Sequence, residues 1–105
     1  QDFQKGLAAY EAGDYATALK EWKPLAEAGG AVAQHNLGYM YEKGQGVLQD
    51  SVVAHMWYNI GAANGNELGG TNRDSISKGM TQQAIEQAQQ MARDCMSSNY
   101  QNCGG

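Results

Sequence analysis

The segment LGYMYEKGQGVLQDSVVAHMWYNIGAANG, residues 37–65, decides the fold because a shorter copy of its pattern precedes it. The tetrapeptide Tyr10-Glu11-Ala12-Gly13 aligns with Tyr41-Glu42-Lys43-Gly44, 31 residues later. Five further positions align 36 residues apart: Asp14, Ala18, Trp22, Ala26 and Gly29 pair with Asp50, Ala54, Tyr58, Ala62 and Gly65. An insert at residues 45–49 accounts for the difference. A period in the thirties with two helices per unit is typical of an α-solenoid, whose units bury their apolar faces against their neighbours.

The repeat pattern predicts an all-α fold, a short right-handed α-solenoid of helix-turn-helix units with a C-terminal capping helix. We place the units at about residues 3–29, 31–65 and 66–97, within one domain that spans residues 1–97. Residues 98–105 form a cysteine-containing tail outside that domain. In the first unit, Gly13-Asp14 supplies the turn and the N-cap between two apolar stripes. Pro24 lies inside the second stripe and predicts a bend near residues 20–23 without ending the helix.

The second unit repeats this plan, and the third departs from it. In the second unit, apolar faces recur at helical spacing: Ala33, Leu37, Met40 and Tyr41 on the first helix, and Val53, Ala54, Trp57, Tyr58 and Ala62 on the second. In the third, Gly69-Gly70 falls inside the helix expected at residues 66–78, and Arg73 stands where Leu37 does, so the regularity of that helix stays open. Thr81 then caps a final amphipathic helix, which we expect to seal the end of the solenoid.

Composition and charge argue against two classes of partner. The 105 residues suffice for one domain with a single core. No apolar run approaches the ~18 residues needed to cross a bilayer, so we expect no membrane insertion. The net charge is −4 and the seven Lys and Arg residues are scattered, whereas a nucleic-acid partner needs a basic cluster. We therefore expect no nucleic-acid partner.

The two cysteines and the first residue bear on the compartment. Cys95 and Cys103 are too far apart for a CxxC redox motif and too few for a zinc site. A disulfide that ties the tail to the end of the last helix is the expected state, and two free thiols in a cytosolic protein are the alternative. The chain begins at Gln1, which indicates either a processed mature form or a trimmed fragment, and processing fits better. We expect a periplasmic or secreted protein whose signal peptide has been removed.

The second unit resembles a complete Sel1-like repeat, the tetratricopeptide-related unit whose two helices are joined by a glycine-containing loop. The residues that carry the resemblance are Leu37, Gly38, Tyr41, Gly44, Gly46, Asp50, Ala54, Trp57, Tyr58, Ala62 and Gly65. They are interpreted as packing residues: Gly38 admits a neighbouring helix, Gly44 and Gly46 allow unusual backbone angles, and Asp50 caps the next helix. The first unit resembles the family more loosely because it lacks the loop. The resemblance implies a scaffold that binds other proteins.

Catalysis finds little support in the sequence. Neither His35 nor His55 has a Cys, Asp or Glu three or four residues away on its own helix, as a metal site would usually show. We expect both to be ordinary surface or edge residues, with a pH-sensitive contact as the minority alternative. Gly44-Gln45-Gly46 is not a phosphate loop, because it follows a helix and lacks the Lys-Ser/Thr ending. We expect no enzyme activity, no metal and no cofactor.

The candidate binding surface lies on the first helix of each unit, on the side that would line a concave face. In the second unit this side is opposite the packing stripe at 100° per residue and comprises His35, Tyr39 and Glu42. The equivalent positions in the first unit are Gln4, Ala8 and Glu11. Tyr39 is the expected anchor, because a tyrosine buries a large area at low entropic cost.

These observations predict a non-enzymatic adaptor that docks a protein or peptide outside the cytoplasm. The alternative is a binder of a small cell-envelope ligand, such as a peptidoglycan fragment, which a polar, aromatic-edged pocket between the first helices would favour. Four aromatic residues are candidates for stacking on a sugar, but their repeat register predicts that they belong to the core: Trp22, Tyr41, Trp57 and Tyr58. Hydrolysis would need a positioned acid and base, which the sequence does not show.

Overall fold

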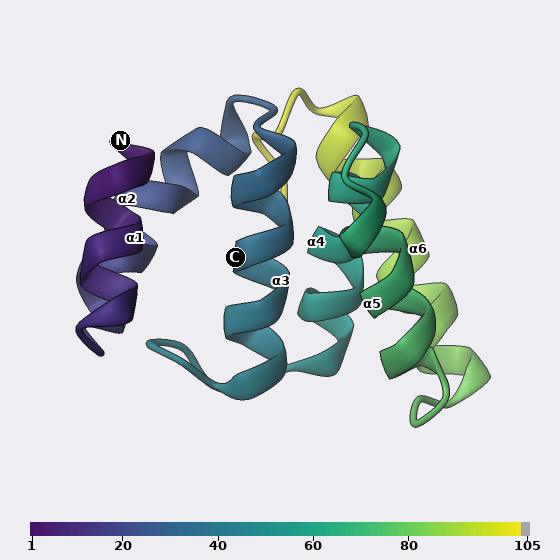
Figure 1. Ribbon diagram of the computed structural model, residues 1–105. Helices are drawn as coiled ribbons and strands as arrows, with labels where there is room; N and C mark the ends of the chain where they lie inside the picture. The colour runs from purple at the N-terminus through teal and green to yellow at the C-terminus, as the bar shows by residue number, and fades with distance from the viewer. Residues whose placement is uncertain (104–105) are drawn as a thin grey trace.

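A computed structural model describes residues 1–103, which form six α-helices and no strand. The helices are α1 (Phe3–Glu11), α2 (Tyr15–Glu27), α3 (Ala31–Lys43), α4 (Ser51–Ala63), α5 (Glu67–Ser77) and α6 (Gln82–Ser97). Figure 1 shows α1, α3 and α5 side by side in one layer, with α2, α4 and α6 behind them. The expectation of an all-α helical-repeat solenoid is confirmed. No helix in the described part of the chain is long and apolar enough to span a membrane.

The core is centred on α4. This helix packs against α3, α5 and α6, whereas α1 packs mainly against α2. Three of its large side chains, Met56, Tyr58 and Ile60, are completely inaccessible to solvent. From α3, Leu37 and Met40 enter the same core, and Trp57 lies within it at 3% exposure. The second unit is therefore the structural centre of the molecule.

Side-chain caps and left-handed glycines set the helix boundaries where the sequence predicted them. The Asp50 carboxylate accepts hydrogen bonds from the amides of Val52 and Val53 at 3.0 and 3.1 Å, and thereby begins α4. Asp14 and Thr81 cap α2 and α6 in the same way. Gly44 ends α3 with a φ of 69°, and Gly46 follows with 74°, angles that side chains resist.

Two irregularities in the sequence leave the helices intact. Helix α2 continues through Pro24 to Glu27, as predicted. The helix left open by the sequence forms as α5, and Gly69 is the reason it packs closely. A Cβ atom at Gly69 would lie only 2.7 Å from the carbonyl oxygen of Tyr58, so the glycine lets α5 approach the backbone of α4. Arg73 then ties α5 to α4 by donating to the Asn59 side chain at 2.8 Å.

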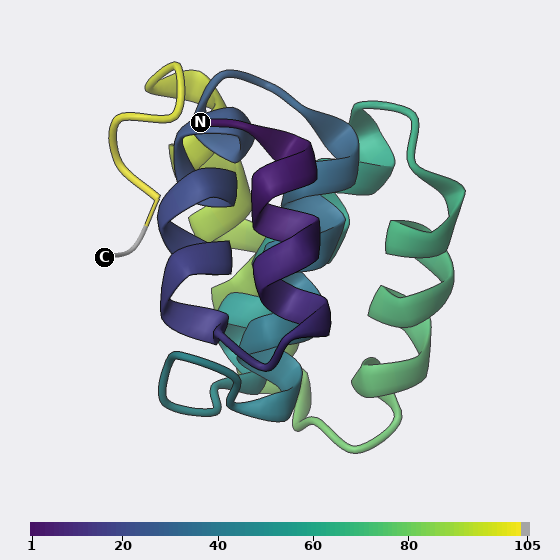
Figure 2. The same cartoon turned by 60° about the vertical axis from the view of Figure 1, so that its left-hand side comes forward.

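The tail folds back onto the helices through the predicted disulfide. Cys95, which is fully buried on α6, is bonded to Cys103. Within the closed loop, the Tyr100 hydroxyl accepts a hydrogen bond from Asn64 Nδ2 at 3.0 Å. The tail lies beside α2 (Figure 2) and, with α2, α3 and α4, surrounds a small hollow of about 110 Å³. Residues 104–105 of the expected tail lie outside the described residues.

Candidate partner-binding groove

A groove runs between α1 and α3, with α2 as its floor; we call it the α1–α3 groove. Its main hollow has a volume of about 360 Å³. The side chains around it are largely aromatic or apolar: Leu7, Tyr10, Trp22, His35, Asn36 and Tyr39. A second hollow of about 420 Å³ lies among Phe3, Leu25, Ala28, Gly30, Ala31, Val32 and Ala33. Phe3 precedes Leu7 by one helical turn, as Val32 precedes Asn36, so the two hollows follow one another along the groove.

Trp22 forms the floor of the main hollow because α1 carries a glycine opposite it. A Cβ atom at Gly6 would lie 2.7 Å from Cδ1 of Trp22, so the glycine leaves room for the ring in its observed position. The indole Nε1 donates to the Phe3 carbonyl oxygen at 3.1 Å, and the ring stacks on Phe3 with a centroid separation of 5.7 Å. Trp22 is thus a core residue whose edge also borders the groove.

Most polar atoms around the main hollow are already hydrogen-bonded within the protein. The Tyr10 hydroxyl donates to Gln45 Oε1 at 2.8 Å, and burial raises the pKa of Tyr10. Asn72 Nδ2 on α5 lies 2.9 Å from His35 Nε2, and because an amide nitrogen only donates, Nε2 accepts. The proton of the neutral ring is then on Nδ1, which donates to Asn36 Oδ1 at 3.1 Å.

This relay leaves one amide group free to meet a ligand. Asn36 Nδ2 has two N–H donors and no hydrogen-bond partner among residues 1–103. The Tyr39 ring stands at the rim, 38% exposed, with the Lys43 ammonium 5.6 Å from its centroid. The groove therefore offers apolar and aromatic walls, one fixed amide donor and a rim hydroxyl.

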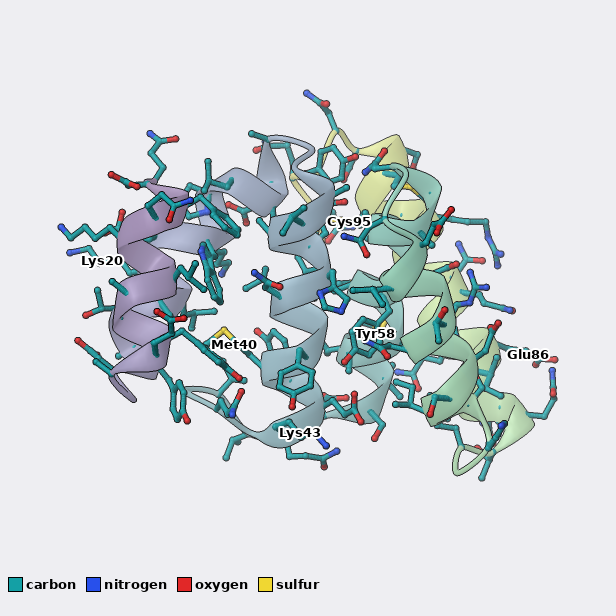
Figure 3. The ribbon with its side chains drawn as sticks, viewed as in Figure 1. Lys20, Met40, Lys43, Tyr58, Glu86 and Cys95 are labelled. Carbon is teal, nitrogen blue, oxygen red and sulfur yellow. A yellow bond between two sulfur atoms is a disulfide. The ribbon has the colours of Figure 1, made fainter. Side chains whose placement is uncertain are left out.

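The structure separates the residues that the sequence grouped as one surface. His35 and Tyr39 border the groove, but Glu42 does not. The Tyr58 hydroxyl donates to Glu42 Oε1 at 2.6 Å, so the expectation that Glu42 points away from the packed side was wrong. The physical reason is Gly38, where a Cβ atom would lie 2.6 Å from the Tyr58 ring. The missing side chain lets Tyr58 cross beneath α3 and reach Glu42. Figure 3 shows Tyr58 between α3 and α5.

The α1 positions derived by translation from α3 also lie elsewhere. Gln4 and Glu11 are exposed, but neither borders a hollow of the groove. The residues of α1 that face the groove are Phe3, Leu7 and Tyr10, which belong to the first of the two apolar stripes expected in this unit. Sequence reasoning also missed Asn36. Its position on α3 could have identified it, because Asn36 lies one helical turn from both Val32 and Tyr39 and therefore on the same side of the helix.

His55 is a second correction. It was expected at the surface or at an edge, but it is 2% exposed on the side of α4 that faces α5. Its Nδ1 atom has no hydrogen-bond partner in the described part of the chain. Burial lowers the pKa of His55, and the nearby positive charge of Arg73 lowers it further, while Asp74 opposes the shift. No group of three His, Cys, Asp or Glu side chains suited to a metal ion occurs among the described residues.

Comparison with known proteins identifies the central unit. Residues 31–66, which span α3, the glycine loop, α4 and the following turn, match the family described as Sel1 repeat. No curated protein matches the chain at a significant level. The matched segment supplies one wall of the α1–α3 groove, and the other wall and the floor come from the first unit.

Proposed function

We propose that this chain, which is a Sel1-repeat protein, acts as a non-enzymatic adaptor that binds a protein or peptide partner in the α1–α3 groove. Sel1 repeats generally mediate interactions between proteins, so a binding scaffold is the role that the family supports. The observation that carries the proposal is the groove itself, whose aromatic walls adjoin a solvent-exposed tyrosine. Exposed aromatic residues beside a hollow are typical anchors of protein partners.

The groove favours a protein partner over the alternative of a small cell-envelope ligand. A sugar or peptidoglycan fragment carries many hydroxyl and amide groups, each of which must be hydrogen-bonded when it is buried. Around the main hollow, Tyr10 and Trp22 donate to other groups of the protein, and both ring nitrogens of His35 are engaged. Because few polar groups remain, such a ligand would lose more hydrogen bonds to water than it gained.

The disulfide supports action outside the cytoplasm. Cys95 and Cys103 are bonded in the folded protein, and disulfides persist mainly in oxidising compartments. We therefore place the adaptor in the periplasm or the extracellular space. Non-reducing mass spectrometry of freshly isolated protein tests this placement. Two alkylatable thiols in that sample would contradict it.

A photo-crosslinking experiment tests the binding role. A benzophenone amino acid is introduced at Tyr39, and at Leu48 as a matched control, since Leu48 is an apolar residue with 91% exposure outside the groove. With extracytoplasmic proteins, we expect an adduct from position 39 alone. Unmodified protein in excess should suppress this adduct, and the Tyr39→Ala variant should need about tenfold higher concentration to do so. Equal adducts from both positions would refute binding in the groove.

The crosslinking design leaves Glu42 unchanged for a structural reason. The sequence placed Tyr39 and Glu42 together on the side of α3 opposite the packing stripe. Because Glu42 accepts the hydrogen bond of the buried Tyr58 hydroxyl, its replacement would also lower stability. The single Tyr39→Ala variant keeps binding and folding effects apart, and we expect it to weaken binding by about tenfold.

A further inference from the structure

We propose that the α1–α3 groove takes an extended peptide segment with two apolar side chains separated by one residue, and that Asn36 binds the main-chain carbonyl between them. This inference rests on the proposed function and names the kind of partner. Three observations carry it: the two hollows adjoin one another, no charged side chain lines either of them, and the main hollow has one side-chain amide without a hydrogen-bond partner among residues 1–103.

The spacing of the hollows matches alternate residues of an extended chain. The nearest lining residues of the two hollows, Phe3 and Leu7 on α1 and Val32 and Asn36 on α3, are four residues apart, or about 6 Å along the helix axis. In an extended peptide, side chains i and i+2 point to the same side and are separated by roughly 6.6 Å. One such pair can therefore enter both hollows at once.

The lining indicates which side chains these are. No Asp, Glu, Lys or Arg lines either hollow within the described residues. The walls are formed by side chains such as Leu7 and Trp22 in one hollow, and Phe3 and Leu25 in the other. A charged side chain would lose its hydration there without gaining an ion pair, whereas an apolar one would gain from burial.

The free amide selects an extended chain over a helix. The main-chain carbonyls of a helix are hydrogen-bonded internally, so a docked helix would leave Asn36 Nδ2 unpaired. An extended segment has free carbonyls between its side chains. Asn36 is held ready for one of them, because the relay from Asn72 through His35 fixes its Oδ1 and directs the amide nitrogen away from the relay. Orientation before binding lowers the entropic cost of association.

Fluorescence polarisation with four labelled peptides tests the proposal. Three are serine- and glycine-based peptides of about eight residues that differ only in having their two leucines one, two or four positions apart. The fourth is an alanine-rich helical peptide of about sixteen residues with leucines four positions apart. We expect the peptide with alternate leucines to bind about tenfold more tightly than the other three. Tighter binding of the helical peptide, equal binding of all four, or no binding would overturn the proposal.

Two matched pairs of variants locate the binding. Asn36→Asp keeps the shape of the side chain but replaces the donor by an acceptor, and Asn102→Asp makes the same change at an exposed tail position. Val32→Glu places a charge beside the second hollow, and Leu48→Glu does so on the exposed loop. We expect each groove variant to bind the alternate-leucine peptide about tenfold more weakly than the unmodified protein does. Each control variant should bind it as tightly as the unmodified protein.

The outcomes also separate this inference from the function on which it rests. If all peptides bind alike and Val32→Glu abolishes their binding, the groove binds peptides without the alternate spacing, and only the inference fails. If the Asn36→Asp variant binds the alternate-leucine peptide as tightly as the Asn102→Asp variant does, the proposed contact between Asn36 and a peptide carbonyl is refuted. If no peptide binds while crosslinking at Tyr39 succeeds, the adaptor role stands with a partner of another kind. Circular dichroism melts confirm that each variant is folded.

Discussion

Two neighbouring gaps on the same face of the molecule, between α1 and α3 and between α3 and α5, follow one repeat plan but are filled differently. In both units an aromatic residue of the second helix lies over a glycine of the first, Trp22 over Gly6 and Tyr58 over Gly38. The first gap remains a groove. The second is closed, because α3 and α5 contact each other and His35 is hydrogen-bonded to Asn72. The closer approach of α5 to α3, reinforced by this hydrogen bond, thus decides which gap stays open.

The largest effect is expected in the core that lies behind both gaps. Trp57 is 3% exposed, and Trp57→Ala should lower the free energy of unfolding by about 3–5 kcal/mol by opening a cavity. Thermal and urea melts measure it, with the exposed Leu48→Ala variant as control. This value gives the scale for the smaller differences between the gaps. An unchanged midpoint would contradict the position of Trp57.

The two glycines should differ in their tolerance of a methyl group. Gly38→Ala drives a Cβ atom into the ring of Tyr58, which is fully buried and held by Glu42, and should cost about 1–3 kcal/mol. Gly6→Ala meets Trp22, whose ring borders an open hollow into which it can shift, so its cost should be smaller. Urea denaturation of both variants gives the comparison. Equal costs would mean that the first gap is packed as tightly as the second.

The hydroxyl groups of two tyrosines provide a finer comparison. Tyr58→Phe removes a hydrogen bond to a carboxylate in the closed gap and should cost about 1.5 kcal/mol. Tyr10→Phe removes one to the neutral Gln45 beside the open gap and should cost about 0.5 kcal/mol. Burial first, and then the bond to Glu42, raises the pKa of Tyr58 far above its usual range, so its hydroxyl stays protonated in these measurements. The reverse order of costs would argue against the closed gap being the better packed.

The smallest expected effect is a pH dependence of the free energy of unfolding that arises from His55, on the side of α4 that faces α5. Because the pKa of buried His55 is lowered in the folded state, the unfolded chain binds the proton more readily. Stability should therefore fall as pH drops below about 6.5, the ordinary histidine value, and this loss should continue until the folded-state pKa is reached. Chemical denaturation between pH 7.5 and about 5 measures the slope. We expect His55→Gln, which retains His35, to flatten it, and an unchanged slope would assign the effect to another group.

Much of the fold was readable in the sequence because its signals are local. Asp50, Gly44 and Thr81 act within one turn of their own position, so their spacing alone predicted the caps and the loop. Gly69 is different. Its effect depends on the backbone of α4, and the sequence alone left a glycine in a helix undecided between breakage and close packing.

The candidate site was predicted less well because it depends on contacts between units. Helical geometry placed His35 and Tyr39 on the side of α3 that borders the groove, but it could not reveal that the Tyr58 ring crosses beneath Gly38 to reach Glu42. His55 was misjudged because a single amphipathic stripe was assumed, whereas α4 is covered by three helices. Asn36 becomes informative only when Asn72, 36 residues away, is known to fix His35.

The attachment of α1 has a consequence for how the groove opens. Because α1 packs mainly against α2, while α4 is held by three helices, the first wall of the groove has less support than the core of the fold. Local opening of such a segment costs less free energy than global unfolding, so amide hydrogens in α1 should exchange faster than those in α4. The wall formed by α3 is fixed in the core, and the wall formed by α1 can yield. A groove with one fixed and one movable wall can adjust its width to partner side chains of different size. The residues of α3 keep their positions meanwhile and contact each partner in the same way.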